Sequence, residues 1–386
     1  MDSLPLSILE DLSPSSKESD PKDVFVYESL VENSEQFTVP PTETLYYTKT
    51  GDSIEFNELS GLKKILIPID PKKKTGKKKK KPVASIIGSD LVHGFEDFTK
   101  PSLETIFQLN DLFSSIKYAI EHEHALKTDF NIISLRRNLL LLMTCPLSNK
   151  ELSFNVIYWR GLIIFDYNWQ LEPQVKEDEL TNKLQYSGFQ FERIITDATD
   201  DTTSFYTFVS HAVNEIPIHF TAEIDATKTS GKYGLSNYIE LKTHTQLKSN
   251  PRTHFNYNFQ KKLLRTWCQN KLVDCTNTAI GFRSSSFTLS SIQKFEATEM
   301  AKLLNSAPVE VYDGCQLNTT KIFKWYKLAI SVIGKYNPGE SNVCTLKYNI
   351  KDIKKDSGLS FHAVDEKQGA MIIDRTIPRW FQDYFK

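Results

Sequence analysis

Segments typical of strands and segments typical of helices alternate along most of this 386-residue chain. Short runs rich in Val, Ile, Phe and Tyr, such as residues 152–169 and 218–226, predict strands. Apolar residues at helical spacing predict helices over 103–125, 134–146 and 257–273. The sequence contains no glycine-rich dinucleotide fingerprint and no internal repeat. This interleaving predicts an α/β fold: a single domain with mixed central β-sheets flanked by helices.

Two stretches differ in composition from the predicted domain. Residues 1–22 are rich in Ser, Pro, Asp and Lys, which predicts a disordered tail before a folded domain over 23–386. Inside that domain, residues 70–83 form a lysine-rich loop with eight lysines between Lys72 and Lys81. Such a loop is compatible with a solvated surface segment, a nuclear-import signal or an arm that binds phosphates.

The bulk composition restricts the possible partners. A formal net charge of −1 provides no overall field for nucleic acid, so local clusters or metal ions must attract any anionic substrate. Five cysteines without CxxC spacing favour reduced thiols in a nucleocytoplasmic protein. No segment has the roughly 20 apolar residues needed to cross a bilayer, and the acidic start does not resemble a secretory signal. We therefore expect a soluble intracellular protein with no membrane partner.

Two predicted strands carry charged residues at alternating positions. Glu223 and Asp225 are two residues apart, so on a strand both would point to one face, and Glu240 and Lys242 have the same spacing on the next strand. If the strands pair as a hairpin, three carboxylates and one ammonium group converge. Three such carboxylates repel one another unless a cation neutralises them, and an oxygen-rich site suits Mg²⁺ or Mn²⁺. The alternative is a half-exposed strand with a solvated charged face.

A fourth carboxylate precedes this pair of strands. Glu192 follows the aromatic run that contains Phe189 and Phe191, which we interpret as a strand with both rings facing the core. Without further context Glu192 would be an ordinary surface glutamate. Next to the other acids it becomes a candidate ligand.

The predicted helix over 257–273 has two unlike faces. One is apolar, and the other carries Lys262, Arg265 and Gln269 at spacing i, i+3, i+7. The polar face could bind phosphates, with Gln269 reaching a scissile group, or could simply be solvated.

Five short motifs occur in an order that resembles the DXO family of decapping and 5′–3′ exoribonucleases. Members of that family show G-Φ-x-Φ-E, E-Φ-D and E-Φ-K motifs, then a helix with the form LL-K/R-x-W-x-Q and a G-F-R strand. The corresponding segments here are Gly188–Glu192, Glu223–Asp225, Glu240–Lys242, Leu263–Gln269 and Gly281–Arg283. The resemblance extends over roughly residues 40–290.

The resemblance implies a PD-(D/E)XK-like active site with two divalent cations, Mg²⁺ or Mn²⁺. It implies that the ligands are Glu192, Asp225, Glu240 and the Leu241 carbonyl, with Glu223 acting directly or through water. Lys242 and Gln269 would contact the scissile phosphate. The implied activities are the release of whole caps (incomplete guanosine, methylated guanosine or NAD caps) and of 5′ mononucleotides. The implied substrate is single-stranded RNA with a capped or monophosphorylated 5′ end.

The first family motif, Trp-Arg-Gly at a helix start, departs from the pattern. It is Leu135-Arg136-Arg137 here, and the literal Trp159-Arg160-Gly161 lies in a predicted strand, so we do not count it. Because the motif arginine helps to hold 5′ phosphates in the family, 5′-triphosphate pyrophosphohydrolase activity is expected to be weak or absent. The change favours the fungal branch that resembles DXO alone. We therefore expect a cytoplasmic location, although the lysines would also allow a nuclear one. We also expect a monomer with no obligate protein partner.

Two other functions are compatible with the same residues. In a non-catalytic RNA-binding or scaffold protein, the carboxylates would be structural and the lysine run would bind RNA. In a DNA-directed nuclease of the PD-(D/E)XK type, the acidic cluster would act on DNA. A binding protein should tolerate EDTA and carboxylate-to-alanine changes, whereas either nuclease should lose turnover.

Overall fold

The structure is a computed structural model that describes residues 36–67, 86–122, 131–171, 178–198, 202–229, 232–350 and 359–385. The predicted tail over 1–22 and the lysine-rich loop over 70–83 lie outside these ranges. No helix in the described ranges is long and apolar enough to cross a membrane.

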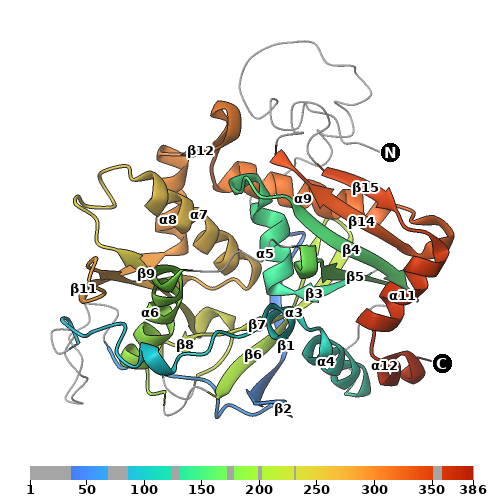
Figure 1. Ribbon diagram of the computed structural model, residues 1–386, viewed down its shortest axis with the longest axis horizontal. Helices are drawn as coiled ribbons and strands as arrows, with labels where there is room; N and C mark the ends of the chain where they lie inside the picture. Colours follow the sequence, from blue (N-terminus) through green and yellow to red (C-terminus); the bar gives the residue numbers. More distant parts are fainter. Residues whose placement is uncertain are drawn as a thin grey trace.

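A nine-stranded mixed sheet forms one half of the molecule (Figure 1). Strand β3 is parallel to its neighbours β5 and β7, whereas the other pairs are antiparallel. In sheet order the strands are β15 (Leu359–Ala363), β14 (Val343–Tyr348), β4 (Leu152–Trp159), β5 (Leu162–Tyr167), β3 (Asn131–Leu135), β7 (Ile216–Glu223), β6 (Thr203–Val213), β1 (Val39–Thr50) and β2 (Ser53–Phe56).

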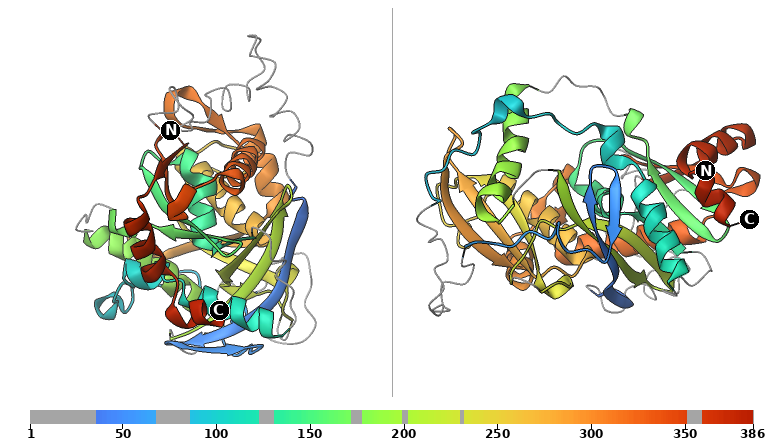
Figure 2. Two further views of the ribbon diagram at one scale, coloured as in Figure 1. Left: turned by 90° about the vertical axis from the view of Figure 1, so that its right-hand side faces the viewer. Right: turned by 90° about the horizontal axis from the view of Figure 1, so that it is seen from below.

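A four-stranded sheet forms the other half (Figures 1 and 2). Its order is β11 (Leu289–Glu296), β10 (Asn277–Arg283), β9 (Tyr238–Thr245) and β8 (Ala226–Thr227). Strands β9 and β10 are parallel, and the outer pairs are antiparallel. A two-stranded ribbon joins β12 (Val309–Glu310) and β13 (Gln316–Leu317).

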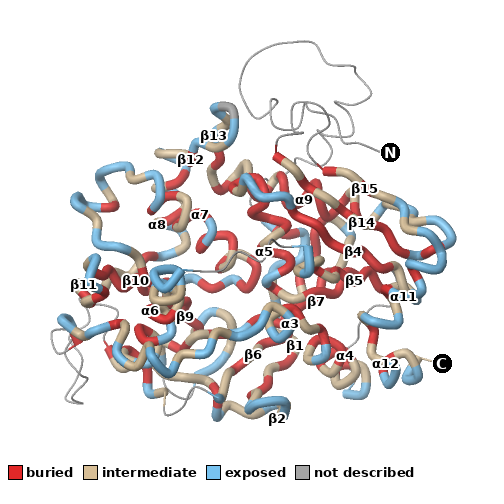
Figure 3. The backbone as a smooth tube through the Cα atoms, viewed as in Figure 1, coloured by how far each residue is buried: buried red, intermediate tan, exposed pale blue. Residues whose placement is uncertain are grey.

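Helices cover both sheets and connect them. They are α3 (Leu103–Phe107), α4 (Asn110–Glu121), α5 (Arg136–Thr144), α6 (Glu179–Ile195), α7 (Tyr257–Leu272), α8 (Ala297–Ser306), α9 (Thr319–Lys335), α11 (Glu366–Thr376) and α12 (Arg379–Tyr384). Buried side chains of α5, α7 and α9 share one apolar core with residues of both sheets, so the two halves pack together. Figure 3 shows this buried interior between the two halves.

The predicted α/β class with mixed sheets flanked by helices is confirmed. Strands β4 and β5 form around Gly161 as expected, and α7 nearly fills the predicted range. The helix predicted over 103–125 is instead two helices, α3 and α4, separated at Gln108 and Leu109. The helix predicted over 134–146 begins only at Arg136, because the residues before it pair in β3.

Two buried histidines make the stability of the nine-stranded sheet depend on pH. Burial lowers the pKa of His211 to about 3 and that of His219 to about 4, from a usual value of 6.5. The stability that depends on the neutral rings is therefore complete above pH 6.5, and it is lost progressively as the pH falls from 6.5 to about 4 for His219 and to about 3 for His211. We expect this loss to reach about 1.4 kcal/mol per pH unit for each histidine.

Urea unfolding at pH 6.5 and pH 4.5 measures this effect by difference. The free energy of unfolding of wild-type protein should fall more between the two pH values than that of His211→Gln. The exposed His122 provides the control, and His122→Gln should behave as wild type. Equal losses in wild type and His211→Gln would contradict the assignment of a neutral buried ring.

Candidate active site

One edge of β9 is open where the two sheets meet. The short strand β8 pairs only with Tyr238 and Ile239, while β10 lies along the other edge of β9. From Glu240 onward, no strand in the described part of the chain covers the first edge. The predicted residues Asp225, Glu240 and Lys242 gather beside this open edge.

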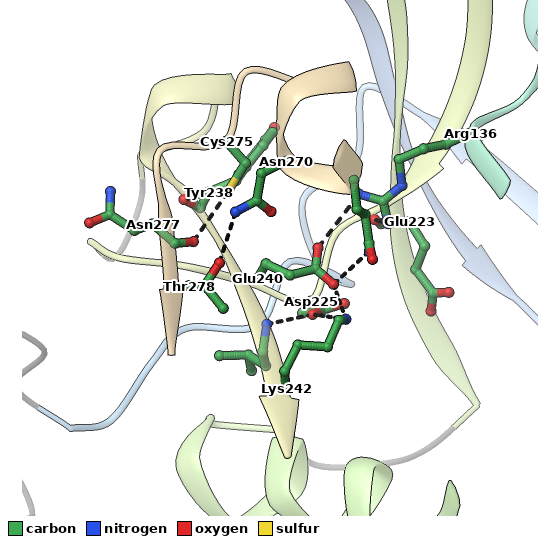
Figure 4. A network of polar contacts seen from close by, with 12 residues as sticks. Arg136, Glu223, Asp225, Tyr238, Glu240, Lys242, Asn270, Cys275, Asn277 and Thr278 are labelled. Carbon is green, nitrogen blue, oxygen red and sulfur yellow. Dashed lines mark hydrogen bonds and ion pairs between the residues drawn. The ribbon is translucent and has the colours of Figure 1, made fainter. Parts of the chain in front are cut away.

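Glu240 is the centre of the cluster, and three donors converge on it (Figure 4). Lys242 Nζ forms a hydrogen bond and ion pair with Glu240 Oε1, and Gln269 Nε2 donates to the same oxygen at 2.6 Å. Arg136 Nη1 lies 3.6 Å from Glu240 Oε2. Burial acts to raise the pKa of Glu240, but the charges of Lys242 and Arg136 lower it below its usual value. Glu240 is therefore held as a carboxylate.

Asp225 and Glu192 are in the opposite electrostatic situation. Asp225 Oδ2 accepts a hydrogen bond from the Leu241 N–H at 2.7 Å and lies 4.0 Å from Lys242 Nζ. Burial and the charge of Glu240 nevertheless raise the pKa of Asp225 to about 7. Burial, and then the charge of Asp225, raise the pKa of Glu192 well above its usual range. Burial, together with the neighbouring carboxylates, thus disfavours the charged forms of Asp225 and Glu192.

A divalent cation fits this donor set. Within the described ranges, no three His, Cys, Asp or Glu side chains already stand together as a metal-binding group. The available donors are nonetheless all oxygens, which Mg²⁺ and Mn²⁺ prefer, and a bound cation would favour the charged forms of Asp225 and Glu192, whose pKa values burial raises. Glu192, Asp225, Glu240 and the Leu241 carbonyl are the residues that would hold it.

The predicted hairpin between the two acidic segments forms only next to its loop, where Ala226 and Thr227 of β8 pair with Ile239 and Tyr238 of β9. Glu223 ends β7 in the nine-stranded sheet, whereas Glu240 and Lys242 lie on β9 in the four-stranded sheet. The chain leaves the first sheet after Glu223, because buried Ile224 and the short β8 carry it across to β9. Asp225 lies in this crossing and not on a strand, so it does not share a strand face with Glu223.

In the described part of the chain no hydrogen bond or ion pair joins the Glu223 side chain to the predicted metal ligands, although its charge contributes, after burial and the charge of Asp225, to the raised pKa of Glu192. The Glu223 side chain is exposed, and the Glu223 backbone carbonyl accepts a hydrogen bond from Arg136 Nη2 at 2.7 Å. Arg136 therefore joins the end of β7 to Glu240 on β9. Arg136 is the first residue of α5, as the resemblance implies for the arginine of the first motif.

The predicted strand before Glu192 is wrong, because these residues belong to the helix α6. Asp178 caps the helix by accepting a hydrogen bond from the Thr181 N–H at 2.7 Å. Phe191 is fully buried, but Phe189 is 47% exposed, so the two rings do not share a core face. Glu192 reaches the cluster from the last turn of a helix.

Helix α7 presents two of its three predicted polar residues to the cluster. Gln269 contacts Glu240, and Lys262 Nζ donates a hydrogen bond to the Thr243 carbonyl on β9. Arg265 is exposed, and in the described part of the chain no hydrogen bond or ion pair connects it with the cluster. The i, i+3, i+7 spacing therefore identified the helix that contacts the cluster, and RNA binding by Arg265 stays a prediction.

Sequence reasoning assigned no role to Arg283, the last residue of β10. This side chain is only 7% exposed, and in the described part of the chain its Nε has no hydrogen-bond partner. The G-F-R motif was the only signal in the sequence that included it. A buried guanidinium with no carboxylate partner among the described residues is a stronger signal, but it becomes visible only in the structure.

Comparison with known proteins places the chain among decapping nucleases. The decapping nuclease RAI1 of Scheffersomyces stipitis is 27% identical over 290 residues, which are 64% of this chain and 72% of the relative. Decapping and exoribonuclease protein 1 of Kluyveromyces lactis is 24% identical over 58% of this chain and 56% of its own length. Relatives of both names match, so the predicted branch stays a prediction.

Solved structures share the fold. The Candida albicans Rai1 complex with pU5–Mn²⁺ has a TM-score of 0.74 at 18% identity, covering 91% of this chain and 97% of that one. The Scheffersomyces stipitis Rai1 complex with (3′-NADP)+ and calcium has a TM-score of 0.72 at 20% identity, covering 91% and 95%. A family model described as RAI1 like PD-(D/E)XK nuclease matches residues 40–382. With the acidic cluster and lysine beside the open edge of β9, this match shows that the chain belongs to the RAI1-like PD-(D/E)XK nuclease family.

Proposed function

We propose that this protein is a divalent-metal-dependent RNA decapping enzyme and 5′–3′ exoribonuclease. The observation that carries the proposal is the convergence of Asp225, Glu240, Lys242 and Gln269 at the open edge of β9. Carboxylates bind the cations, which when bound polarise the phosphoryl oxygen and activate water. Lys242 and Gln269 donate hydrogen bonds at the place where negative charge develops.

Two related structures support RNA as the substrate. The Candida albicans Rai1 structure contains pU5 and Mn²⁺, and the Scheffersomyces stipitis structure contains (3′-NADP)+ and calcium. An oligonucleotide with a 5′ phosphate and a nicotinamide dinucleotide both place a phosphate next to a nucleoside. A site that accepts both suits a nuclease that removes NAD or guanosine caps and then shortens the RNA.

The altered first motif supports a restricted activity on triphosphates, because Leu135-Arg136-Arg137 stands where the family has Trp-Arg-Gly. Arg136 is largely buried, and its Nη2 donates to the Glu223 carbonyl. Its Nη1 lies 3.6 Å from Glu240 Oε2 and has no hydrogen-bond partner among the described residues. We propose that whole caps and monophosphorylated ends are cleaved, and that pyrophosphate release is weak or absent. We further propose that the protein is a cytoplasmic monomer that needs no protein partner.

The test uses one RNA sequence with a monophosphate, triphosphate, guanosine-capped or NAD-capped 5′ end, and a DNA strand of the same sequence. Purified protein with Mg²⁺ or Mn²⁺ should release caps and 5′ mononucleotides from the RNA, and EDTA should stop both reactions. Glu240→Ala/Lys242→Ala should be inactive. RNA binding without any change at the 5′ ends would favour a non-catalytic binding protein, and equal cleavage of DNA would favour a DNA-directed nuclease.

A further inference from the structure

Building on the proposed function, we infer that Asp197 and the extended segment Lys63–Ile67, which we name the strap, position the carboxylates that bind the metal. Neither Asp197 nor any residue of the strap is a predicted ligand. The strap lies between the end of α6, which carries Glu192, and β8, which begins directly after Asp225. These two ligands belong to different elements, so their spacing depends on what joins those elements.

On one side, the strap pairs with β8. The Ile65 N–H donates to the Thr227 carbonyl at 3.1 Å, and the Thr227 N–H donates to the Lys63 carbonyl at 2.8 Å. These are the hydrogen bonds of two parallel strands, so the strap extends the four-stranded sheet by one position beyond β8. Thr227 comes only two residues after Asp225. The pairing therefore fixes the place where Asp225 crosses between the two sheets.

On the other side, the strap is bonded to the end of α6. The Leu66 N–H donates to the Ile195 carbonyl at 2.8 Å, and the Asp197 N–H donates to the Lys64 carbonyl at 3.0 Å. Asp197 Oδ1 accepts a hydrogen bond from the Lys64 N–H at 2.5 Å. Asp197 thus binds Lys64 through both its backbone and its side chain. Glu192 stands three residues before Ile195, so these bonds hold the helix turn that carries it.

The buried side chains of the strap pack against the neighbours of the ligands. Ile65 and Ile67 are 1% and 2% exposed and belong to one apolar cluster. The same cluster contains a residue from each ligand-bearing segment: Phe191 next to Glu192, Ala226 next to Asp225, Ile239 next to Glu240, and Leu241 itself. A displacement of the strap would therefore change the spacing of the ligands.

The carboxylates need such support because they repel one another when charged. Burial, and then the charge of Asp225, raise the pKa of Glu192 well above its usual range. Before a cation binds, contacts outside the carboxylates must keep the two groups at the spacing that a cation requires. Backbone hydrogen bonds from the strap to both segments provide this support, because they do not depend on the charge of either carboxylate.

The experiment measures Mn²⁺ binding to the folded full-length protein in the absence of RNA. The electron paramagnetic resonance signal of free Mn²⁺, followed during titration with protein, gives the dissociation constant. Asp197→Ala removes the acceptor of the Lys64 N–H and should weaken Mn²⁺ binding about tenfold. Asp197→Asn keeps an oxygen that can accept the same bond, so its binding should stay within about twofold of wild type.

Asp90→Ala is the matched control. Asp90 is another exposed aspartate, and its Oδ1 accepts a hydrogen bond from the Val92 N–H at 2.9 Å beside the same apolar cluster. This bond joins two residues of one loop and not two ligand-bearing segments. Asp90→Ala should therefore bind Mn²⁺ as wild type does.

Two further measurements separate positioning from support of the fold. Urea unfolding in EDTA gives the stability of each variant, which a purely structural segment would change without changing the affinity of the folded protein. At limiting Mn²⁺, Asp197→Ala should cleave 5′-monophosphorylated RNA about tenfold more slowly than wild type. Saturating Mn²⁺ should restore its kcat to within about threefold, because mass action offsets the weaker binding.

A smaller change carries the same test if Asp197→Ala does not fold. Ile65→Val removes one buried methyl group from the strap and should weaken Mn²⁺ binding about threefold. Ile164→Val makes the same change at a fully buried position of β5 in the other sheet, and its Mn²⁺ affinity should equal that of wild type.

Unchanged Mn²⁺ affinity in Asp197→Ala would overturn the inference, because the strap would then support only the fold. Equal weakening in Asp90→Ala would overturn it too. The proposed function can fail separately: a wild type that binds Mn²⁺ with the expected differences between variants, but leaves every RNA 5′ end intact, would refute the nuclease and keep the positioning role. A wild type that binds no Mn²⁺ would refute both.

Discussion

Glu240→Gln should reduce the metal-dependent cleavage of a 5′-monophosphorylated RNA by at least about a thousandfold, while the protein stays folded. Three donors converge on this carboxylate: Lys242, Gln269 and Arg136. An amide of the same size removes one negative charge and presents an N–H₂ group to donors that need an acceptor. Cation binding and the orientation of Lys242 and Gln269 are therefore lost together. Single-turnover cleavage at saturating Mn²⁺ measures the loss in the chemical step.

The matched control is Glu43→Gln, which changes another largely buried carboxylate. Glu43 Oε2 accepts hydrogen bonds from Thr207 Oγ1 and Tyr238 Oη, both at 2.7 Å, and it connects β1 with β6 and β9. The oxygen of a glutamine can accept the same bonds, so cleavage should stay within about threefold of wild type. If Glu240→Gln retained more than a tenth of wild-type cleavage, Glu240 would not be a metal ligand in the reaction.

Much of the fold could be predicted because its signals are local. The helical spacing of apolar residues in α7 and the strand pair around Gly161 both depend on a few neighbouring residues. The division of β7 and β9 between two sheets could not be predicted in this way. Strand pairing depends on contacts between parts of the chain that are distant in sequence. Two segments with alternating apolar and charged residues, separated by a short loop, suggest a hairpin even where the two strands belong to different sheets.

The site residues were more predictable than the elements that carry them. Asp225, Glu240, Lys242 and Gln269 meet as expected, since their chemistry requires neighbours of opposite charge. Glu192 was placed on a strand because the aromatic residues before it alternate. The buried positions of α6 in fact follow helical spacing, and the cap at Asp178 lies outside the short stretch that suggested a strand.

Asp225→Asn should abolish cleavage and, in EDTA at pH 8, stabilise the protein. Burial and Glu240 raise the pKa of Asp225 to about 7, so folding at pH 8 must keep a carboxylate charged where the charge is unfavourable. Below about pH 4 this carboxyl is protonated in both the folded and the unfolded protein, so the penalty is absent. The penalty grows as the pH rises from about 4 to 7 and stays constant above that. The asparagine oxygen can still accept the Leu241 N–H, so the free energy of unfolding should rise on the order of 2 kcal/mol at pH 8.

Mn²⁺ should reverse the order of the two proteins. Cation binding stabilises the folded state in proportion to the logarithm of the cation concentration over its dissociation constant, so wild type should gain stability that Asp225→Asn does not. Urea unfolding at pH 8, with EDTA and with Mn²⁺, measures the charge penalty and the gain from cation binding. The exposed Glu55 on β2 provides the control, and Glu55→Gln should show the wild-type stability in EDTA and the wild-type gain with Mn²⁺. If Asp225→Asn were less stable than wild type in EDTA, the Asp225 charge would be satisfied by Lys242 and Leu241 alone. The cluster would then be a structural ion-pair network. A metal site differs from such a network because its carboxylates carry negative charge that only a bound cation relieves.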